Sequence, residues 1–171
     1  LILKTFGSSI NGTTSSITQF LSFITLLQGG VGTVARLAFY RPLAMNDQQG
    51  ISVAYKTVAS FYQKFSVVFC IYLAVLSVAY PLIVETGYDF FYVASLVLIL
   101  GLSSIFEYFF GQASQMLLYA AQRNYIYSSI QILCTIGSTI VGVYLVQNGA
   151  SIHVVKFVSA LIYAIRPVAL W

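Results

Sequence analysis

The sequence predicts an all-α protein, a polytopic transmembrane helix bundle, because of its composition and its pattern of apolar runs. Of its residues, 59% are hydrophobic and only 7% are charged, and the mean hydropathy is +0.89. A soluble domain carries about a quarter charged residues, so this chain cannot cover a globule with polar surface. Apolar runs of about 20 residues, the length of a membrane-crossing helix, follow one another along the chain. We expect a single helical bundle over residues 1–171.

The first predicted span lies at about 17–40 and orients the segments that follow it. Leu21–Arg41 is apolar, with a glycine cluster at its middle and Arg36 and Arg41 at its far end. Small residues let a neighbouring helix approach closely, and the arginines can extend to the headgroups at one interface. Residues 1–16 contain a Thr/Ser run, and we expect them to form the tail of an earlier segment followed by a loop.

The connection at 42–64 is polar and is expected on the cytoplasmic side. From Ile51 onward its apolar residues recur at helical spacing, which predicts an interfacial helix leading into the next span. Basic residues outnumber acids around this connection, which fixes its side of the membrane. The cations are Arg36, Arg41, Lys56 and Lys64, against the single acid Asp47.

Four more apolar runs predict further spans, at about 65–84, 90–118, 125–146 and 152–171. The turn at 85–89 is acidic and contains no Lys or Arg, which places it outside. The turn at 121–124 carries Arg123 and returns the chain to the cytoplasm, and the polar turn at 147–151 lies outside again. The basic residues therefore alternate between loops, as expected for a multi-spanning bundle.

Several function classes are not supported by the sequence. Cys70 and Cys134 fall within apolar runs and His153 is the sole histidine, so we expect neither a disulfide framework nor a metal site. Gly30-x-Gly32 lies inside a span and not between a strand and a helix, so it is not a nucleotide fingerprint. No nucleophile with its base is recognisable, so we expect no enzyme and no cofactor. The basic residues form no single face, which argues against nucleic-acid binding.

Four runs of small, aromatic and basic residues carry a family resemblance. They are GTTSSITQFLSFITLLQGGVGTVARLAFYRPLA, YPLIV, FFGQASQMLLYAAQRNYIYSSIQI and SIHVVKFVSALIYAIRP. In this order they resemble the bacterial polysaccharide (lipid-linked oligosaccharide) flippases of the multidrug/oligosaccharidyl-lipid/polysaccharide exporter superfamily. The resemblance implies a MATE-like flippase fold of two helical lobes, of which this chain is part of the N-terminal lobe. The start without methionine and the end inside an apolar run also suggest a fragment of a longer protein.

The resemblance implies a transporter of the bacterial cytoplasmic membrane. It would flip undecaprenyl-pyrophosphate-linked oligosaccharide outward for the biosynthesis of surface polysaccharide in the cell envelope. The implied partners are the lipid-linked oligosaccharide, membrane lipids, a driving ion (H⁺ or Na⁺) and the enzymes that assemble envelope polysaccharide.

Three basic residues are candidates for the cavity that such a headgroup needs. A pyrophosphate-sugar group can cross a low-dielectric layer only through a hydrated cavity that offers cations. Arg36, Lys156 and Arg166 are the candidates, Arg166 foremost because it lies well along an apolar helix and precedes Pro167. The alternatives are a topology anchor for Arg36 and a lysine that snorkels to the outer surface for Lys156.

Glu107 is the only carboxylate deep inside a predicted span. It is a candidate for coupling H⁺ or Na⁺ or for pairing with a cavity cation, and the alternative is a neutral acid satisfied by polar neighbours. Four glutamines are candidates for binding sugar hydroxyls, although such amides more often simply join helices: Gln28, Gln112, Gln115 and Gln131.

Two other functions remain open at this stage. A MATE-type multidrug or cation exporter of the same fold predicts acidic residues in its cavity, whereas an anionic headgroup predicts a net positive one. A non-transporting integral membrane scaffold predicts helices packed without a central aqueous cavity. The cations Arg36, Lys156 and Arg166 against one acid favour the flippase.

Overall fold

A computed structural model describes the backbone at residues 2–84 and 87–169 and the side chains at 5–24, 30–84 and 87–167. The described chain is helical and contains no strand, which confirms the all-α prediction. Its elements are α1 (Ile2–Ala44), α2 (Gln48–Ile83), α3 (Phe90–Phe106), the π-helical turn η1 (Glu107–Gly111), α4 (Gln112–Ala120), α5 (Asn124–Gln147) and α6 (Ile152–Ala169).

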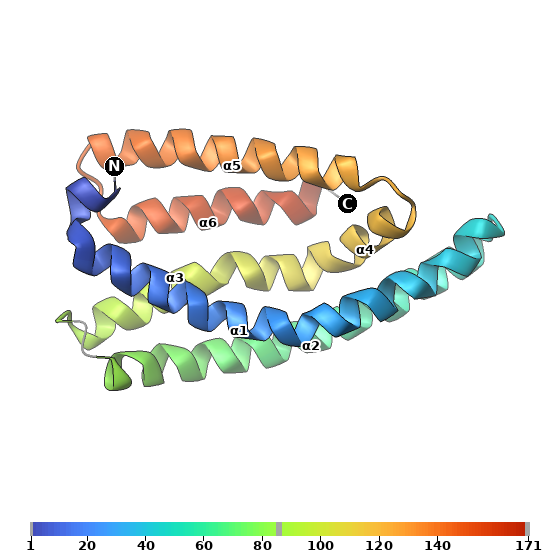
Figure 1. Ribbon diagram of the computed structural model, residues 1–171, viewed down its shortest axis with the longest axis horizontal. Helices are drawn as coiled ribbons and strands as arrows, with labels where there is room; N and C mark the ends of the chain where they lie inside the picture. The colour runs from blue at the N-terminus through green and yellow to red at the C-terminus, as the bar shows by residue number, and fades with distance from the viewer. Residues whose placement is uncertain (1, 85–86, 170–171) are drawn as a thin grey trace.

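The helices lie roughly side by side in an elongated bundle (Figure 1). α1 and α2 form a long antiparallel hairpin whose closed end extends past the other helices. The continuous segment of α3, η1 and α4 crosses the middle of the bundle, and α5 and α6 pack against each other on its far side. α6 also packs on α3, so the central segment contacts both pairs.

Three described helices are long and apolar enough to cross a membrane. They are α2, the combined segment Phe90–Ala120, and α5. Large apolar side chains also project from the bundle, with Ile83 78%, Phe91 83% and Leu133 69% exposed. A soluble protein rarely leaves so much apolar surface in water, whereas lipid accommodates it. The protein is therefore a membrane protein. The further spans predicted at 17–40 and 152–171 lie in α1 and α6 and stay predictions.

The expected loop within residues 1–16 is wrong, because α1 already begins at Ile2. The Thr/Ser run is helical because its hydroxyls bond within the helix. Thr13 Oγ1 donates to the carbonyl of Ser9 at 3.0 Å, and Thr14 Oγ1 donates to that of Ile10 at 2.8 Å. Such bonds satisfy the hydroxyls without leaving the helix. Before this run α1 has a kink at Gly7, whose φ of +83° is not helical.

The connection predicted at 42–64 is mostly helical. α1 continues to Ala44, and α2 begins at Gln48 and runs without interruption to Ile83. The helix expected from Ile51 onward is confirmed, but it is continuous with the following span. It is not purely interfacial either, because Val58 and Tyr62 are buried in the bundle.

Three of the helices end in the same hydrogen-bonded turn. After α5, the N–H of Gly149 donates to the carbonyl of Val146 at 3.2 Å, and the N–H of Ala150 donates to that of Leu145 at 3.0 Å. This is the Schellman arrangement, which requires one residue with positive φ. Gly149 supplies it with φ of +74° after α5, Gln122 with +58° after α4, and Asn46 with +51° after α1. These turns close the helix ends and reverse the chain.

Asp47 caps the first turn of α2. Its Oδ1 accepts a hydrogen bond from the N–H of Gly50 at 3.0 Å. An Asp47→Ala variant should therefore lose about 0.5–2 kcal/mol of stability, measured as unfolding of the purified protein in detergent. Asp47→Ser keeps an oxygen that can accept the same bond and serves as the control. Equal stability of the alanine and serine variants would contradict a capping role.

Two buried clusters hold the bundle together, one on each side of η1. The first joins α1, α2 and α3, and the second joins α1, α2 and α4. η1 itself is fixed to α2 by Tyr108, whose ring meets those of Phe65 and Phe69 edge-on at 5.3 and 5.1 Å between centroids. The backbone of η1 is therefore positioned by packing on both flanks.

Polar contacts between helices add to this packing. Tyr72 Oη donates to the carbonyl of Phe20 at 2.7 Å and joins α2 to α1. The hydroxyls of Tyr55 and Ser114 lie 3.0 Å apart and join α2 to α4. Hydrogen bonds of this kind contribute to helix association where the hydrophobic effect between helices is absent.

Candidate functional site

A buried ion pair joins the central segment to α6. The guanidinium of Arg166 donates through Nε to Glu107 Oε2 at 3.0 Å and through Nη2 to the same oxygen. The Arg166 side chain is 14% exposed and that of Glu107 is 9% exposed. The sequence singled out both residues separately, and the structure brings them together. Glu107 is thus an acid paired with a cation.

Tyr127 of α5 completes this constellation. Its hydroxyl donates to Glu107 Oε1 at 3.3 Å, and Arg166 Cζ lies 5.2 Å from the centroid of its ring. The carboxylate therefore accepts on both oxygens, and the guanidinium gains a cation–π contact. Sequence reasoning missed Tyr127, because a tyrosine near a span end reads first as part of an interfacial belt.

The π turn and a glycine allow this close approach. In η1 the N–H of Gln112 donates to the carbonyl of Glu107, five residues earlier. A β-carbon on Gly111 would lie 3.2 Å from Glu107 Cδ and 3.2 Å from Pro167 Cβ. The missing side chain thus leaves room for both the carboxylate and α6. Turns of this π type occur preferentially at functional sites.

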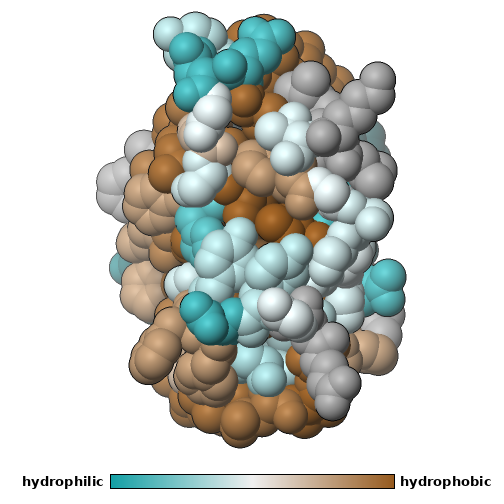
Figure 2. All heavy atoms as spheres, turned by 90° about the vertical axis from the view of Figure 1, so that its left-hand side faces the viewer, coloured by the Kyte–Doolittle hydropathy of each residue, from teal (hydrophilic) through white to brown (hydrophobic). Residues whose placement is uncertain are grey.

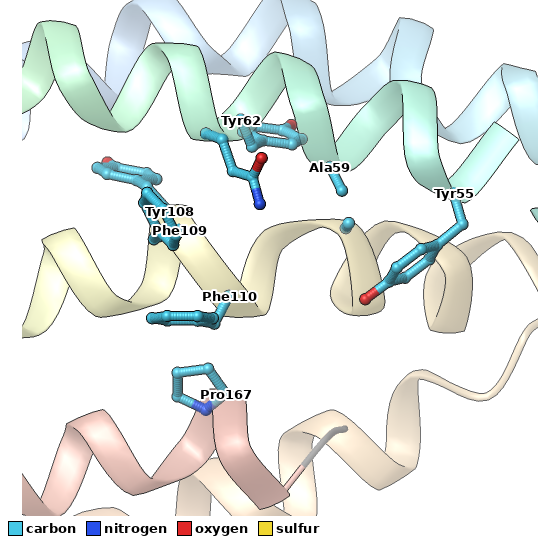
Figure 3. A pocket seen from close by; sticks show the side chains of 9 residues that line it. Tyr55, Ala59, Tyr62, Tyr108, Phe109, Phe110 and Pro167 are labelled. Carbon is cyan, nitrogen blue, oxygen red and sulfur yellow. The ribbon is translucent and has the colours of Figure 1, made fainter. Parts of the chain in front are cut away.

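An aromatic pocket of about 450 Å³ adjoins the ion pair. Figure 3 shows side chains of α2 on one wall and those of η1 with Pro167 on the other. Phe109 and Phe110 of its lining are 40% and 48% exposed, so the pocket opens at the surface of the bundle. Its lining suits an apolar group. It consists of Tyr55, Ala59, Tyr62, Gln63, Tyr108, Phe109, Phe110, Ala113 and Pro167.

A second cavity, of about 500 Å³, has a mixed lining, in which Val143, Val146 and Val155 lie beside hydroxyl-bearing residues and a lysine. We call it the Lys156 cavity. It lies between α5 and α6, and Asn11 of α1 also lines it. Lys156 is half-buried there, and no described carboxylate lies within ion-pair distance of it. Its hydroxyl-bearing residues are Ser138, Thr139, Ser159 and Tyr163.

The two cavities occupy different parts of the bundle. The Lys156 cavity lies toward the end that carries the α5–α6 connection and the start of α1 (Figure 1). Figure 2 views this end: hydrophilic and weakly polar residues gather over its upper and central parts, and hydrophobic residues cover much of its sides. This distribution places polar groups at one end of the helices and apolar groups where lipid would lie.

The remaining candidates from the sequence lie elsewhere. Arg36 is half-buried, donates from Nε to the carbonyl of Gly32 at 3.3 Å, and lies over the ring of Tyr119 with Cζ 5.3 Å from its centroid. Gln112 is buried and Gln115 is half-buried, and neither cavity is lined by these two or by Arg36. The side chain of Gln28 lies outside the described residues.

Comparison with protein-family models, with curated proteins and with solved structures finds no match for this chain. The fold defines the class, a helical membrane protein with three helices long and apolar enough to span a bilayer among the described residues. The two cavities and the ion pair are the features that bear on a more particular function.

Proposed function

We propose that this chain forms part of a flippase that moves undecaprenyl-pyrophosphate-linked oligosaccharide outward across the bacterial cytoplasmic membrane, for surface polysaccharide biosynthesis. Two observations support the proposal. The four sequence runs quoted above resemble those of such flippases. The Lys156 cavity offers a half-buried cation among hydroxyl groups, between helices of a membrane protein.

The Lys156 cavity carries the proposal because its chemistry matches the headgroup. A lysine ammonium attracts phosphate as a point charge, and serine, threonine and asparagine side chains can exchange hydrogen bonds with sugar hydroxyls. If α6 is a span, as the sequence predicts, a half-buried cation there is costly without a counter-ion, water or an anionic ligand. A phosphorylated, hydroxyl-rich headgroup meets both requirements.

The charge balance favours this substrate over an exported cation. A cation exporter needs an acid that is free to bind its substrate. Among the described residues Glu107 is the one acid within a span, and Arg166 already neutralises it. The other described acids, Asp47 and Asp89, precede α2 and α3. Because its described lining includes Lys156 and no carboxylate, the Lys156 cavity has a net positive charge.

Two further parts of the proposal follow from the same geometry. A scaffold without transport would need no cation beside hydroxyl groups in a cavity between helices, so the Lys156 cavity favours transport. H⁺ or Na⁺ at Glu107 would compete with Arg166 for the charge of the carboxylate, because this guanidinium is bound to Oε2. Arg166 would act through this pair and not as a free cation for the substrate.

Lys156 provides the direct test. In a bacterial strain lacking its flippase, the full-length protein should restore surface polysaccharide, and Lys156→Ala should reduce transport by about tenfold or more, because a charge-assisted hydrogen bond contributes about 1.5–3 kcal/mol. Lys156→Arg should keep most of the activity. Lys64→Ala, which removes an exposed lysine of α2, is the matched control at equal membrane abundance.

The outcomes separate clearly. Failure of the wild-type protein to restore surface polysaccharide would refute the flippase assignment. Full activity of Lys156→Ala would remove the cavity from the transport route. A loss in Lys64→Ala as large as in Lys156→Ala would show that overall basic charge, and not the cavity, determines activity.

A further inference from the structure

Helix α5 carries polar residues along one side of an otherwise apolar span. An α-helix turns by about 100° per residue, so positions three and four apart share a side. Six such positions fall within an arc of roughly 100° by this geometry. We call them the α5 polar stripe: Ser128, Gln131, Thr135, Ser138, Thr139 and Gly142.

The hydroxyls of the stripe leave their oxygens available as acceptors. Thr135 Oγ1 donates to the carbonyl of Gln131 at 2.8 Å, Thr139 Oγ1 to that of Thr135 at 2.7 Å, and Ser138 Oγ to that of Thr135 at 3.1 Å. Each of these hydroxyl protons has a carbonyl acceptor within the helix, which leaves oxygen lone pairs to accept, and Thr135 Oγ1 already accepts from the Tyr163 hydroxyl. The stripe thus presents a row of acceptors.

Gln131 indicates that something other than lipid faces the stripe. Its side chain is exposed, and its amide makes no hydrogen bond to any other part of the described chain. It stands well inside α5, a helix long and apolar enough to span the membrane. An unsatisfied amide facing hydrocarbon costs several kcal/mol. Water or a polar ligand is therefore the expected neighbour.

Two hollows follow the stripe, and Tyr163 of α6 lines the first of them. Ser138, Thr139 and Gly142 line the Lys156 cavity. Ser128, Gln131 and Thr135 line a further hollow of about 400 Å³. The Tyr163 hydroxyl donates to Thr135 Oγ1 at 3.4 Å and lies 3.4 Å from Ser138 Oγ, so it contacts one residue from each hollow.

We propose that the α5 polar stripe is the surface along which the saccharide of the substrate lies, with its phosphates at Lys156. This inference rests on the flippase function proposed above and adds the orientation of the headgroup. From Gly142 to Gln131 the stripe extends about 16 Å at 1.5 Å per residue, which suits a short saccharide. Binding of a phosphorylated lipid that carries no sugar would require only Lys156. The acceptor row and the Gln131 amide match sugar hydroxyls.

Cysteine labelling of the full-length protein in lipid vesicles tests whether the stripe faces water. In a Cys70→Ala/Cys134→Ala background, Gln131→Cys, Thr135→Cys and Thr139→Cys introduce single thiols on the stripe. Leu133→Cys and Ile140→Cys are the matched controls on the apolar face of the same helix, where both residues are exposed. A membrane-impermeant thiol reagent should label the stripe at least about tenfold faster, because thiolates form in water and not in hydrocarbon.

Protection by two lipids tests what the stripe binds. Undecaprenyl pyrophosphate carrying a short oligosaccharide should slow labelling at Gln131→Cys and Thr135→Cys severalfold. Undecaprenyl pyrophosphate without sugar should slow it only near Lys156, at Thr139→Cys. Equal protection by both lipids at all three positions would show that the phosphate or the lipid is bound, and would overturn the saccharide assignment.

The remaining outcomes are also decisive. Labelling of the stripe as slow as that of the controls would mean that protein or lipid covers it, and the inference would fail. The substitutions are small, and thermal unfolding of each variant identifies any that does not fold. The three stripe positions give independent readings. If Lys156→Ala abolishes transport while no stripe position is protected, this inference falls and the flippase proposal stands. If the wild-type protein transports nothing, the flippase proposal falls regardless of labelling.

Discussion

Replacing Glu107 with alanine should lower the free energy of unfolding by about 3–5 kcal/mol, the cost of leaving one partner of a buried ion pair alone. Arg166 would keep its charge but lose both of its hydrogen bonds to the carboxylate. The contact between the central segment and α6 would lose its polar link at the same time. Thermal or denaturant unfolding of the purified protein in detergent measures the change.

Two controls separate the effect of the Glu107 charge on stability from that of the contacts around it. Tyr127→Phe removes one hydrogen bond to Glu107 and keeps the ring beneath Arg166, so it should cost only about 0.5–1.5 kcal/mol. The double variant Glu107→Gln/Arg166→Gln removes both charges and should recover most of the loss. A Glu107→Ala protein as stable as the wild type would show that the pair contributes nothing to stability.

Replacing Gly101 with leucine should destabilise the protein by about 1–3 kcal/mol, because it overpacks a buried helix contact. A β-carbon at Gly101 would overlap Leu73 Cδ1 and lie 2.7 Å from its Cδ2 and 3.1 Å from its Cγ. Leu73 is itself only 3% exposed and has little room to move. Glycine at this point lets α3 approach α2 closely, the use that small residues have in membrane helices.

Gly137→Leu is the matched control for this prediction. A β-carbon there has no neighbour within 4 Å, so the change should not destabilise the protein and should add up to about 1 kcal/mol through helix propensity. Adding Leu73→Ala to Gly101→Leu should restore part of the lost stability by making space. The prediction fails if the two glycine variants unfold at the same temperature.

Much of the helical layout could be predicted from the sequence, because lipid-facing helices leave a strong signal. The spans predicted at 90–118 and 125–146 correspond closely to the observed segments Phe90–Ala120 and Asn124–Gln147. Each is an apolar run bounded by a polar turn. The start of α1 was missed because a Thr/Ser run resembles a loop, whereas hydroxyls that bond to the preceding turn leave a helix intact.

The candidate site was harder to predict, because its parts meet only through tertiary packing. Glu107 and Arg166 are 59 positions apart, and nothing local indicates that they pair. Likewise, nothing local in the sequence indicates that Asn11, Lys156 and Tyr163 line one cavity. The α5 polar stripe, by contrast, has a visible signal: polar residues three and four apart within an apolar run.

The π turn has a consequence for how α3 and α4 are aligned. In one regular α-helix, rotation by about 100° per residue would point Met116 and Ala120 well away from the side that Val93 and Val97 bury. The turn at η1 holds one residue more than an α-helical turn, so it offsets the rotation of α4 relative to α3 by about 100°. This offset brings the buried faces of α3 and α4 toward a common side. Deletion of a single residue from η1 would therefore rotate α4 about its own axis by about 100° relative to α3 and turn its buried face away from α1 and α2.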